Sequence, residues 1–210
     1  MMPSPFHELV IAGAAVERAR AAVILLHGRG ASAQDMLGIA EALDQSDIAY
    51  LAPQAPGSSW YPYSFLAPIA QNEPALSRAL DTVGALLAET ETRGIPRQRL
   101  GILGFSQGGC LALEFAARHA ARYGGIVGLS AGVIGPKDMQ RSYPGSLADT
   151  PVFIGCSDID PHIPLWRVQE TTRVMLDLGA RVTERIYPGM GHAVNEDEIA
   201  HVRALLSNIS

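Results

Sequence analysis

The stretch Leu100-Gly101-Ile102-Leu103-Gly104-Phe105-Ser106-Gln107-Gly108 decides the fold of this chain. It opens as a short apolar run, reaches a Gly-x-Ser-x-Gly motif at residues 104–108, and continues with the spacing of an apolar helix face. Such a motif between a strand and a helix is typical of a sharp turn that lifts the serine hydroxyl above a sheet, with glycines where a Cβ would meet the neighbouring backbone. We predict a strand over 100–105, a helix over 107–119, and Ser106 as a candidate nucleophile.

Further apolar runs on either side of this stretch predict the rest of a sheet. Most are continuously apolar, which is typical of strands buried on both faces of a parallel sheet. They cover residues 9–12, 22–26, 48–51, 125–129 and 152–155, whereas residues 181–186 alternate with polar neighbours like a half-exposed edge strand. Helical spacing lies between them, over residues 33–43, 74–92, 165–178 and 196–206. The prediction is a three-layer α/β fold, in which a mostly parallel sheet carries helices on both faces.

The length of the chain bears on its domain organisation. Its 210 residues can bury one sizeable core, and the pattern of strands and helices continues throughout, so we predict one domain over residues 1–210. Two segments rich in glycine and proline, 52–72 and 130–150, follow strands, where open α/β sheets place their ligand sites. Little chain is left for a large cap domain.

Composition and charge exclude several classes of function. With 48% hydrophobic residues and a net charge of −5, the chain has neither the composition of a disordered protein nor the basic character of a nucleic-acid-binding one. No apolar run approaches the roughly 20 residues that cross a bilayer, and residues 1–8 lack the pattern of a secretion signal. Two cysteines are too few for a disulfide scaffold, so a cytoplasmic location is predicted.

A serine nucleophile needs a base, and the base needs an acid that orients it. His192 follows the last predicted strand on a glycine-rich loop that can present its imidazole to Ser106. For the acid, the loop after residues 152–155 offers both Asp158 and Asp160. We favour Asp160, because one proline restricts the loop just beyond it and another suits the first turn of the next helix. Asp158 stays the alternative, and no metal site is predicted, because no further ligand cluster follows.

The stretch Leu26-His27-Gly28-Arg29-Gly30 ends an early strand and is predicted to supply half of an oxyanion hole. Two amides are needed, one from the residue after the nucleophile and one from an early loop. We assign them to the backbone N–H groups of Gln107 and Arg29, because the flanking glycines let the loop turn. His27 is predicted to brace this loop by hydrogen bonds, and the Arg29 side chain is expected to be solvated.

In chain order, these motifs resemble the phospholipase/carboxylesterase family of α/β-hydrolases, which includes bacterial carboxylesterases and acyl-protein thioesterases. The resemblance implies a triad of Ser106, Asp160 and His192, with oxyanion amides from Arg29 and Gln107. The family motif Asp-Pro-x-Val-Pro matches at Asp160, with isoleucine in place of valine. The resemblance also implies pairing into a homodimer. It extends from Val23 to Leu206 and rests on residues 26–30, 55–56 with Trp60, 104–109, 128–130, 160–164 and 189–192.

The predicted reaction is hydrolysis of short to medium acyl esters through an acyl-enzyme on Ser106, without a cofactor. Trp60 and Met190 are predicted to line the substrate pocket, near further aromatic residues at positions 61, 63 and 65. Two departures from the family, Cys156-Ser157 in place of a His-Gly pair and Arg29 in place of an apolar residue, count against a long acyl or thioester preference. The alternatives are an acyl-protein thioesterase or lysophospholipase, and a catalytically silent hydrolase fold that only binds a ligand.

Overall fold

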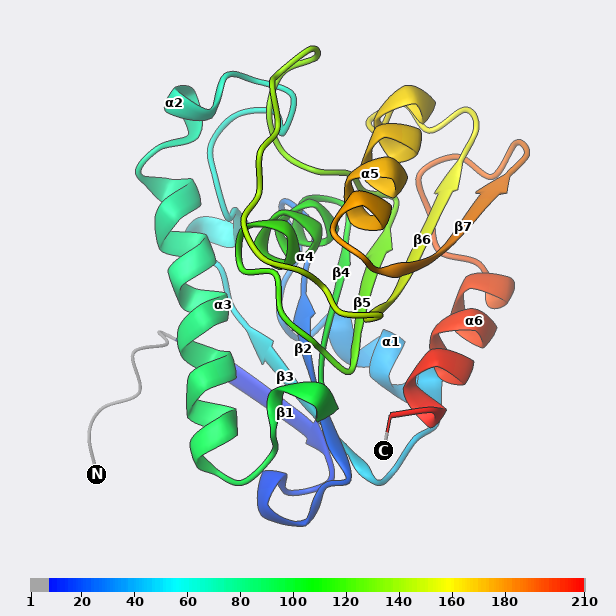
Figure 1. Cartoon of the computed structure of the whole chain (residues 1–210). Helices are drawn as coiled ribbons and strands as arrows, with labels where there is room; N and C mark the ends of the chain where they lie inside the picture. Colours follow the sequence, from blue (N-terminus) through cyan, green and yellow to red (C-terminus); the bar gives the residue numbers. More distant parts are fainter. Residues whose placement is uncertain (1–7, 210) are drawn as a thin grey trace.

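A twisted sheet runs through the middle of the molecule, with helices packed on both of its faces (Figure 1). The computed structural model describes residues 8–209, so the prediction about a secretion signal falls almost wholly outside the described residues. Within residues 8–209 the sheet has seven strands in the order β1-β3-β2-β4-β5-β6-β7. They are β1 (Leu9–Gly13), β2 (Ala21–Leu26), β3 (Ile48–Pro53), β4 (Leu100–Phe105), β5 (Gly125–Leu129), β6 (Pro151–Ser157) and β7 (Arg181–Tyr187).

The helices form two layers that bury separate faces of the sheet. One core lies between the sheet and α3, α4 and α5, and the other lies between the sheet and α1 and α6. A short helix, α2, which the periodicity did not predict, precedes α3. The helices are α1 (Met36–Leu43), α2 (Ile69–Asn72), α3 (Ala75–Thr92), α4 (Gln107–Arg118), α5 (Leu165–Asp177) and α6 (Glu196–Ser207). The predicted three-layer α/β fold with a mostly parallel sheet is therefore confirmed, and no large cap is inserted within the described residues.

The first strand differs from its prediction. The sequence predicts residues 9–12 as one of the parallel strands buried on both faces, whereas β1 pairs antiparallel with β3 at the edge of the sheet and keeps exposed residues. A short apolar run is compatible both with a strand buried on both faces and with an edge strand covered on one face. At the opposite edge, β7 alternates between exposed and half-buried residues, as its sequence predicts.

The parallel strands bring several loops to one end of the sheet. From β2 to β7, each neighbouring pair in the sheet is parallel, so the segments that follow β2, β4, β6 and β7 emerge at the same edge. These segments begin at residues 27, 106, 158 and 188 and carry the motifs that the sequence singles out. No helix in the described part of the chain is both long and apolar enough to span a bilayer.

Candidate active site

Ser106 lies on a sharp turn between β4 and α4. Its backbone has φ 53° and ψ −120°, a left-handed conformation that a residue with a side chain adopts only at a cost. Glycines make the turn possible, because a Cβ on Gly104 would lie 2.3 Å from the backbone of Gly108, and a Cβ on Gly108 would lie 2.1 Å from the carbonyl oxygen of Leu26. The turn therefore holds the Ser106 hydroxyl clear of the helix that follows.

Ser106, His192 and Asp160 form a continuous chain of hydrogen bonds. His192 Nε2 lies 2.9 Å from Ser106 Oγ, and His192 Nδ1 lies 2.7 Å from Asp160 Oδ2. The ring of Phe105 packs against the imidazole of His192 with 4.9 Å between ring centroids, and the ring of His162 meets it edge-on at 4.8 Å. The three side chains thus have the contacts that nucleophile activation by a base and an acid requires.

The carboxylate of Asp160 is buried and is held by several donors. Its Oδ1 accepts hydrogen bonds from the backbone N–H groups of His162 and Ile163 at 2.8 and 3.0 Å, and the thiol of Cys156 lies 3.8 Å from Oδ2. Burial alone would raise the pKa of Asp160, but the hydrogen bonds from His192 and from the two backbone amides outweigh it and lower the pKa. Asp160 is therefore kept ionised beside His192.

Asp158, the alternative acid, is exposed and makes no contact with His192. Its Oδ1 accepts a hydrogen bond from the backbone N–H of Gly189 at 2.8 Å. The hydroxyl of Ser157 accepts a second one from the N–H of Gly191 at 3.1 Å. The end of β6 and the loop after it therefore hold the backbone of the loop that carries His192, and Asp158 supports that loop rather than the imidazole.

Backbone N–H groups suited to an oxyanion lie on both sides of Ser106. Gln107 is the first residue of α4, where helix N–H groups lack partners within the helix and carry partial positive charge. Across from it, a Cβ built on Gly28 would lie 3.4 Å from Ser106 Cβ, so the loop of residues 28–30 passes close to Ser106. Among the described residues, the backbone N–H groups of Arg29 and Gln107 donate no hydrogen bond outside regular elements.

His27 braces this early loop, as its sequence position predicts. Its ring is buried, its Nδ1 lies 2.7 Å from the carbonyl oxygen of Gly28, and its Nε2 accepts the N–H of Ala55 at 3.1 Å. Burial lowers the pKa of His27, which favours a neutral ring with the proton on Nδ1. His27 is therefore engaged in holding residues 27–29 against residue 55.

A cavity of about 450 Å³ opens beside Ser106. The sequence predicts Trp60 and Met190 as lining residues, but neither lines this cavity. Trp60 is buried behind the neighbouring segment, where its indole N–H donates to the carbonyl oxygen of His27 at 2.9 Å. Met190 is turned toward Asn195, whose amide nitrogen lies 2.9 Å from its sulfur. The residues that line the cavity include Tyr61, Phe65, Cys110, His162 and Ile163.

The Arg29 side chain also differs from its prediction. It is exposed, but it is not simply solvated, because its guanidinium donates to four oxygen atoms of the segment that follows Pro56–Ser58. The acceptors are the hydroxyl of Ser59 and the carbonyl oxygens of Tyr61, Pro62 and Tyr63, at 2.7 to 3.0 Å. Composition and spacing gave no signal for this contact, since its acceptors are mostly backbone atoms.

A buried glutamate lies under the loop that carries His192. Glu198 forms a capping box with Asn195 at the start of α6, in which each side chain bonds the backbone N–H of the other residue. Its second carboxylate oxygen has no hydrogen-bond partner among the described residues and lies against Gly155 of β6. Burial raises the pKa of Glu198 to about 7.

The raised pKa of Glu198 predicts a pH-dependent stability. The folded protein binds this proton more tightly than the unfolded chain, whose pKa is 4.5, so the free energy of unfolding falls as the pH rises from 4.5 to 7. We expect this loss to reach about 3 kcal/mol and to be absent in Glu198→Gln, which keeps the cap without the charge. Urea unfolding of both proteins between pH 4.5 and 8 measures it, and parallel curves would contradict the prediction.

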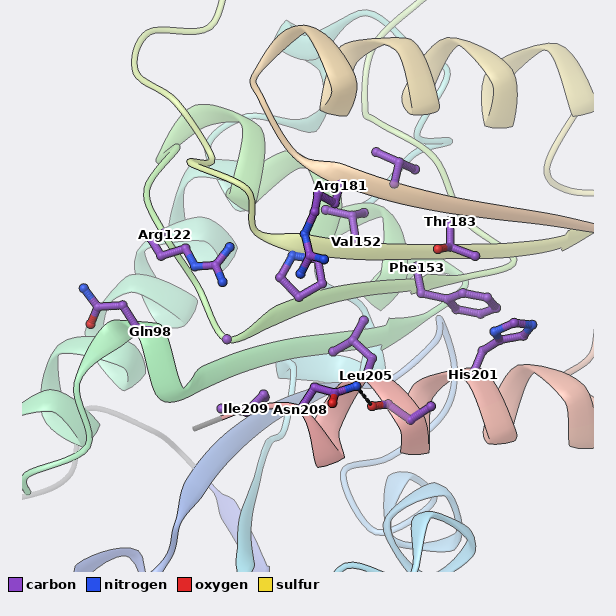
Figure 2. A pocket seen from close by; sticks show the side chains of 14 residues that line it. Gln98, Arg122, Val152, Phe153, Arg181, Thr183, His201, Leu205, Asn208 and Ile209 are labelled. Atoms are coloured by element: carbon purple, nitrogen blue, oxygen red, sulfur yellow. Dashed lines mark hydrogen bonds between the residues drawn. The ribbon is translucent and has the colours of Figure 1, made fainter.

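A larger hollow, of about 670 Å³, lies at the other end of the sheet (Figure 2). It is lined by the first residues of β6 and β7 and by the last turns of α6, with Gln98 and Arg122 near one end and His201 near the other. Ser106 follows the carboxyl end of β4, whereas this hollow lies at the amino ends of β6 and β7. Ser106, His162 and His192 line the smaller cavity and not this one.

Comparisons with known proteins place the chain in a family and a fold. A family model described as Phospholipase/Carboxylesterase matches residues 7–210. The chain is 28% identical to acyl-protein thioesterase 1 of Candida albicans over 91% of this chain and 93% of that protein. It is similar to the crystal structure of a phospholipase/carboxylesterase from Dyadobacter fermentans, with 43% identity, a TM-score of 0.92 and 96% of each chain covered. A Bacillus cereus carboxylesterase, at 20% identity and a TM-score of 0.80 over 99% and 96% of the two chains, shares the fold.

Proposed function

Because the chain belongs to the phospholipase/carboxylesterase family of α/β-hydrolases, a family of ester-hydrolysing enzymes, we propose that it is a serine carboxylesterase for short to medium acyl esters. The observation that carries the proposal is the hydrogen-bond chain from Ser106 through His192 to Asp160, at 2.9 and 2.7 Å. A silent binding protein would have no need of a serine in a strained conformation beside an oriented imidazole.

In the proposed acylation step, Ser106 Oγ attacks the ester carbonyl carbon while His192 Nε2 accepts the hydroxyl proton. The carbonyl oxygen becomes an oxyanion and is held by the backbone N–H groups of Arg29 and Gln107. Collapse of the tetrahedral intermediate breaks the bond to the alcohol oxygen, which leaves with the proton from His192. Asp160 stays ionised throughout and stabilises the imidazolium that forms in each transition state.

In the deacylation step, a water molecule replaces the alcohol. His192 removes its proton, and the resulting hydroxide oxygen attacks the acyl carbon bound to Ser106. Collapse of this second intermediate breaks the acyl–Oγ bond, returns the proton to Ser106 and releases the carboxylic acid. Both steps use side chains and backbone amides of this chain alone.

The size and lining of the cavity support short to medium acyl groups. About 450 Å³ is available, and buried aromatic and aliphatic side chains of Tyr61, Phe65 and Ile163 face it. Cys110 also lines it, and burial raises the pKa of that thiol to about 12, so it acts as an apolar neighbour and not as a nucleophile. Apolar walls of this kind favour hydrocarbon acyl groups over charged ones.

A series of p-nitrophenyl esters tests the acyl preference. We expect kcat/KM to be greatest between the acetate and octanoate esters and to fall for longer chains, because the cavity offers no further apolar wall. A maximum at dodecanoate or palmitate would contradict this expectation. A fluorophosphonate probe supplies the parallel test of the enzyme class, since it should add to Ser106 and to no other serine.

A thioesterase is the second candidate, because full-length relatives of this chain carry that name. Palmitoyl thioesters and a lysophospholipid, assayed beside the p-nitrophenyl esters, separate it from the first candidate. We further propose a cytoplasmic location, which is supported by two free, buried cysteines among the described residues. Pairing into a homodimer and organisation as one domain over residues 1–210 stay predictions.

A further inference from the structure

Residues 59–63, which we call the partition segment, separate two cavities. On one side lies the cavity beside Ser106, and on the other lies a cavity of about 580 Å³ against the face of α3. Tyr61 lines both cavities, while Trp60 and Pro62 line only the second. The partition segment contains no regular secondary structure, so its position depends on contacts with the rest of the chain.

Arg29 supplies four of those contacts. Its Nη1 donates to Ser59 Oγ at 3.0 Å and to the Pro62 carbonyl at 2.9 Å. Its Nη2 donates to the carbonyls of Tyr61 and Tyr63 at 2.9 and 2.7 Å. Three successive carbonyl oxygens thus converge on one guanidinium, and Arg29 forms no ion pair with a carboxylate among residues 8–209. A planar cation with five N–H donors is suited to hold several acceptors at once.

The buried side chain of Gln107 holds the same segment, in part through the same acceptors, Ser59 Oγ and the Tyr61 carbonyl. Its Oε1 accepts the backbone N–H of Trp60 at 3.0 Å, and its Nε2 donates to the Tyr61 carbonyl at 2.8 Å. The two residues whose backbone amides flank Ser106 therefore both fix the partition segment with their side chains. A shift of the partition segment would therefore also shift the backbone N–H groups of Arg29 and Gln107 beside Ser106.

We infer that Arg29 is a specificity-determining residue, whose side chain keeps the partition segment closed and so limits the length of the acyl chain. The inference rests on the proposed esterase function and extends it to a second, latent binding site. With the guanidinium removed, the segment loses four of its hydrogen bonds, and the cavity against α3 becomes continuous with the cavity beside Ser106. The ligand of this second site is the distal, unbranched hydrocarbon part of a long acyl group, because its walls are largely apolar.

The test compares Arg29→Met with the wild-type enzyme on p-nitrophenyl butanoate and p-nitrophenyl decanoate. Methionine keeps the backbone amide and much of the side-chain length but has no donors. We expect the ratio of kcat/KM for decanoate over butanoate to rise at least about tenfold, since each newly buried methylene favours binding about fourfold, mainly through a lower KM for decanoate. Arg29→Lys, with its charge and three donors, should stay within about threefold of the wild-type ratio. Arg93→Met, which removes an arginine paired with Glu17, is the matched control and should leave the ratio unchanged.

A second readout needs no substrate. The chain has two tryptophans, so in a Trp166→Phe background Trp60 alone reports on the partition segment. Trp60 is buried in the closed segment, and acrylamide quenching of its fluorescence should increase severalfold on Arg29→Met and not on Arg93→Met. Unchanged quenching would overturn the inference whether or not the enzyme hydrolyses esters. Increased quenching with an equal fall of kcat/KM for both esters would overturn the specificity role, and a wild-type enzyme inactive on every ester would instead reject the proposed function.

Discussion

Replacing Ser106 by alanine is expected to lower kcat for ester hydrolysis by about five to six powers of ten. The substitution removes the oxygen that lies 2.9 Å from His192 Nε2 and that would carry the acyl group. The residual rate over water should come from the oxyanion donors and from substrate binding alone. Steady-state assays with p-nitrophenyl butanoate and mass spectrometry after fluorophosphonate treatment both measure the loss.

The fold should tolerate this change, so a loss of activity would report on the reaction and not on unfolding. Although Ser106 precedes α4, its side chain makes no capping hydrogen bond, so alanine removes no support from the helix. Ser106→Gly is the matched control, because glycine adopts φ 53° without strain and should raise the free energy of unfolding by about 1 kcal/mol while being equally inactive. Activity within a factor of about ten of wild type in either variant would show that Ser106 is not the nucleophile.

The second large effect is expected at Asp160. Asparagine has nearly the same shape but carries no charge, so it can leave His192 in the wrong tautomer and cannot stabilise the imidazolium; kcat should fall by about four powers of ten. The asparagine side-chain oxygen can still accept the hydrogen bonds that the two backbone N–H groups donate to Oδ1 of Asp160, so the loop should keep its conformation. Measurements of kcat from pH 5 to 9 test this. Loss of the charge lowers kcat across the whole range, whereas a shifted pH optimum would restore it at another pH.

Asp158→Asn is the internal control for that experiment. Its oxygen can still accept the N–H of Gly189, and the residue is exposed and has no contact with the imidazole. We therefore expect its kcat to stay within about threefold of wild type, as for a surface position away from the reacting atoms. Equal losses in the two variants, or a larger loss at Asp158, would mean that the acid has been misassigned.

The sequence predicts the fold well where one local pattern has one structural solution. A continuous apolar run that ends in Gly-x-Ser-x-Gly matches β4, the turn and the start of α4 to the residue. The same reasoning misjudges β1, because the short apolar run over residues 9–12 does not distinguish a parallel central strand from an antiparallel edge strand. Strand direction depends on which partner the chain meets after folding, and periodicity carries no information about that partner.

The candidate site divides in the same way. Ser106, Asp160 and His192 can be proposed from the sequence, because glycines permit the tight turns at Ser106 and His192 and a proline fixes the backbone just after Asp160. The residues that line the cavity cannot be proposed in this way. They lie on segments without regular secondary structure, where the direction of successive side chains follows no fixed period. Trp60 and Tyr61 are adjacent and both buried, yet only Tyr61 reaches the cavity beside Ser106. The hydrogen bonds from Arg29 to the partition segment likewise cannot be predicted from the sequence, since these acceptors are backbone carbonyls that any residue would supply.

The order of strands in the sheet has a consequence for how the enzyme loses activity on warming. Ser106, the proposed nucleophile, follows β4, which has strands on both sides and is buried. His192, the proposed base, follows β7, an edge strand with one unpaired side among the described residues. Amide exchange is slowest at the centre of such a sheet and fastest at its rim, because rim strands open without global unfolding. Fraying of β7 would carry the imidazole away from an intact serine turn. On warming, catalysis would then cease before the core melts, and cooling would restore it without refolding.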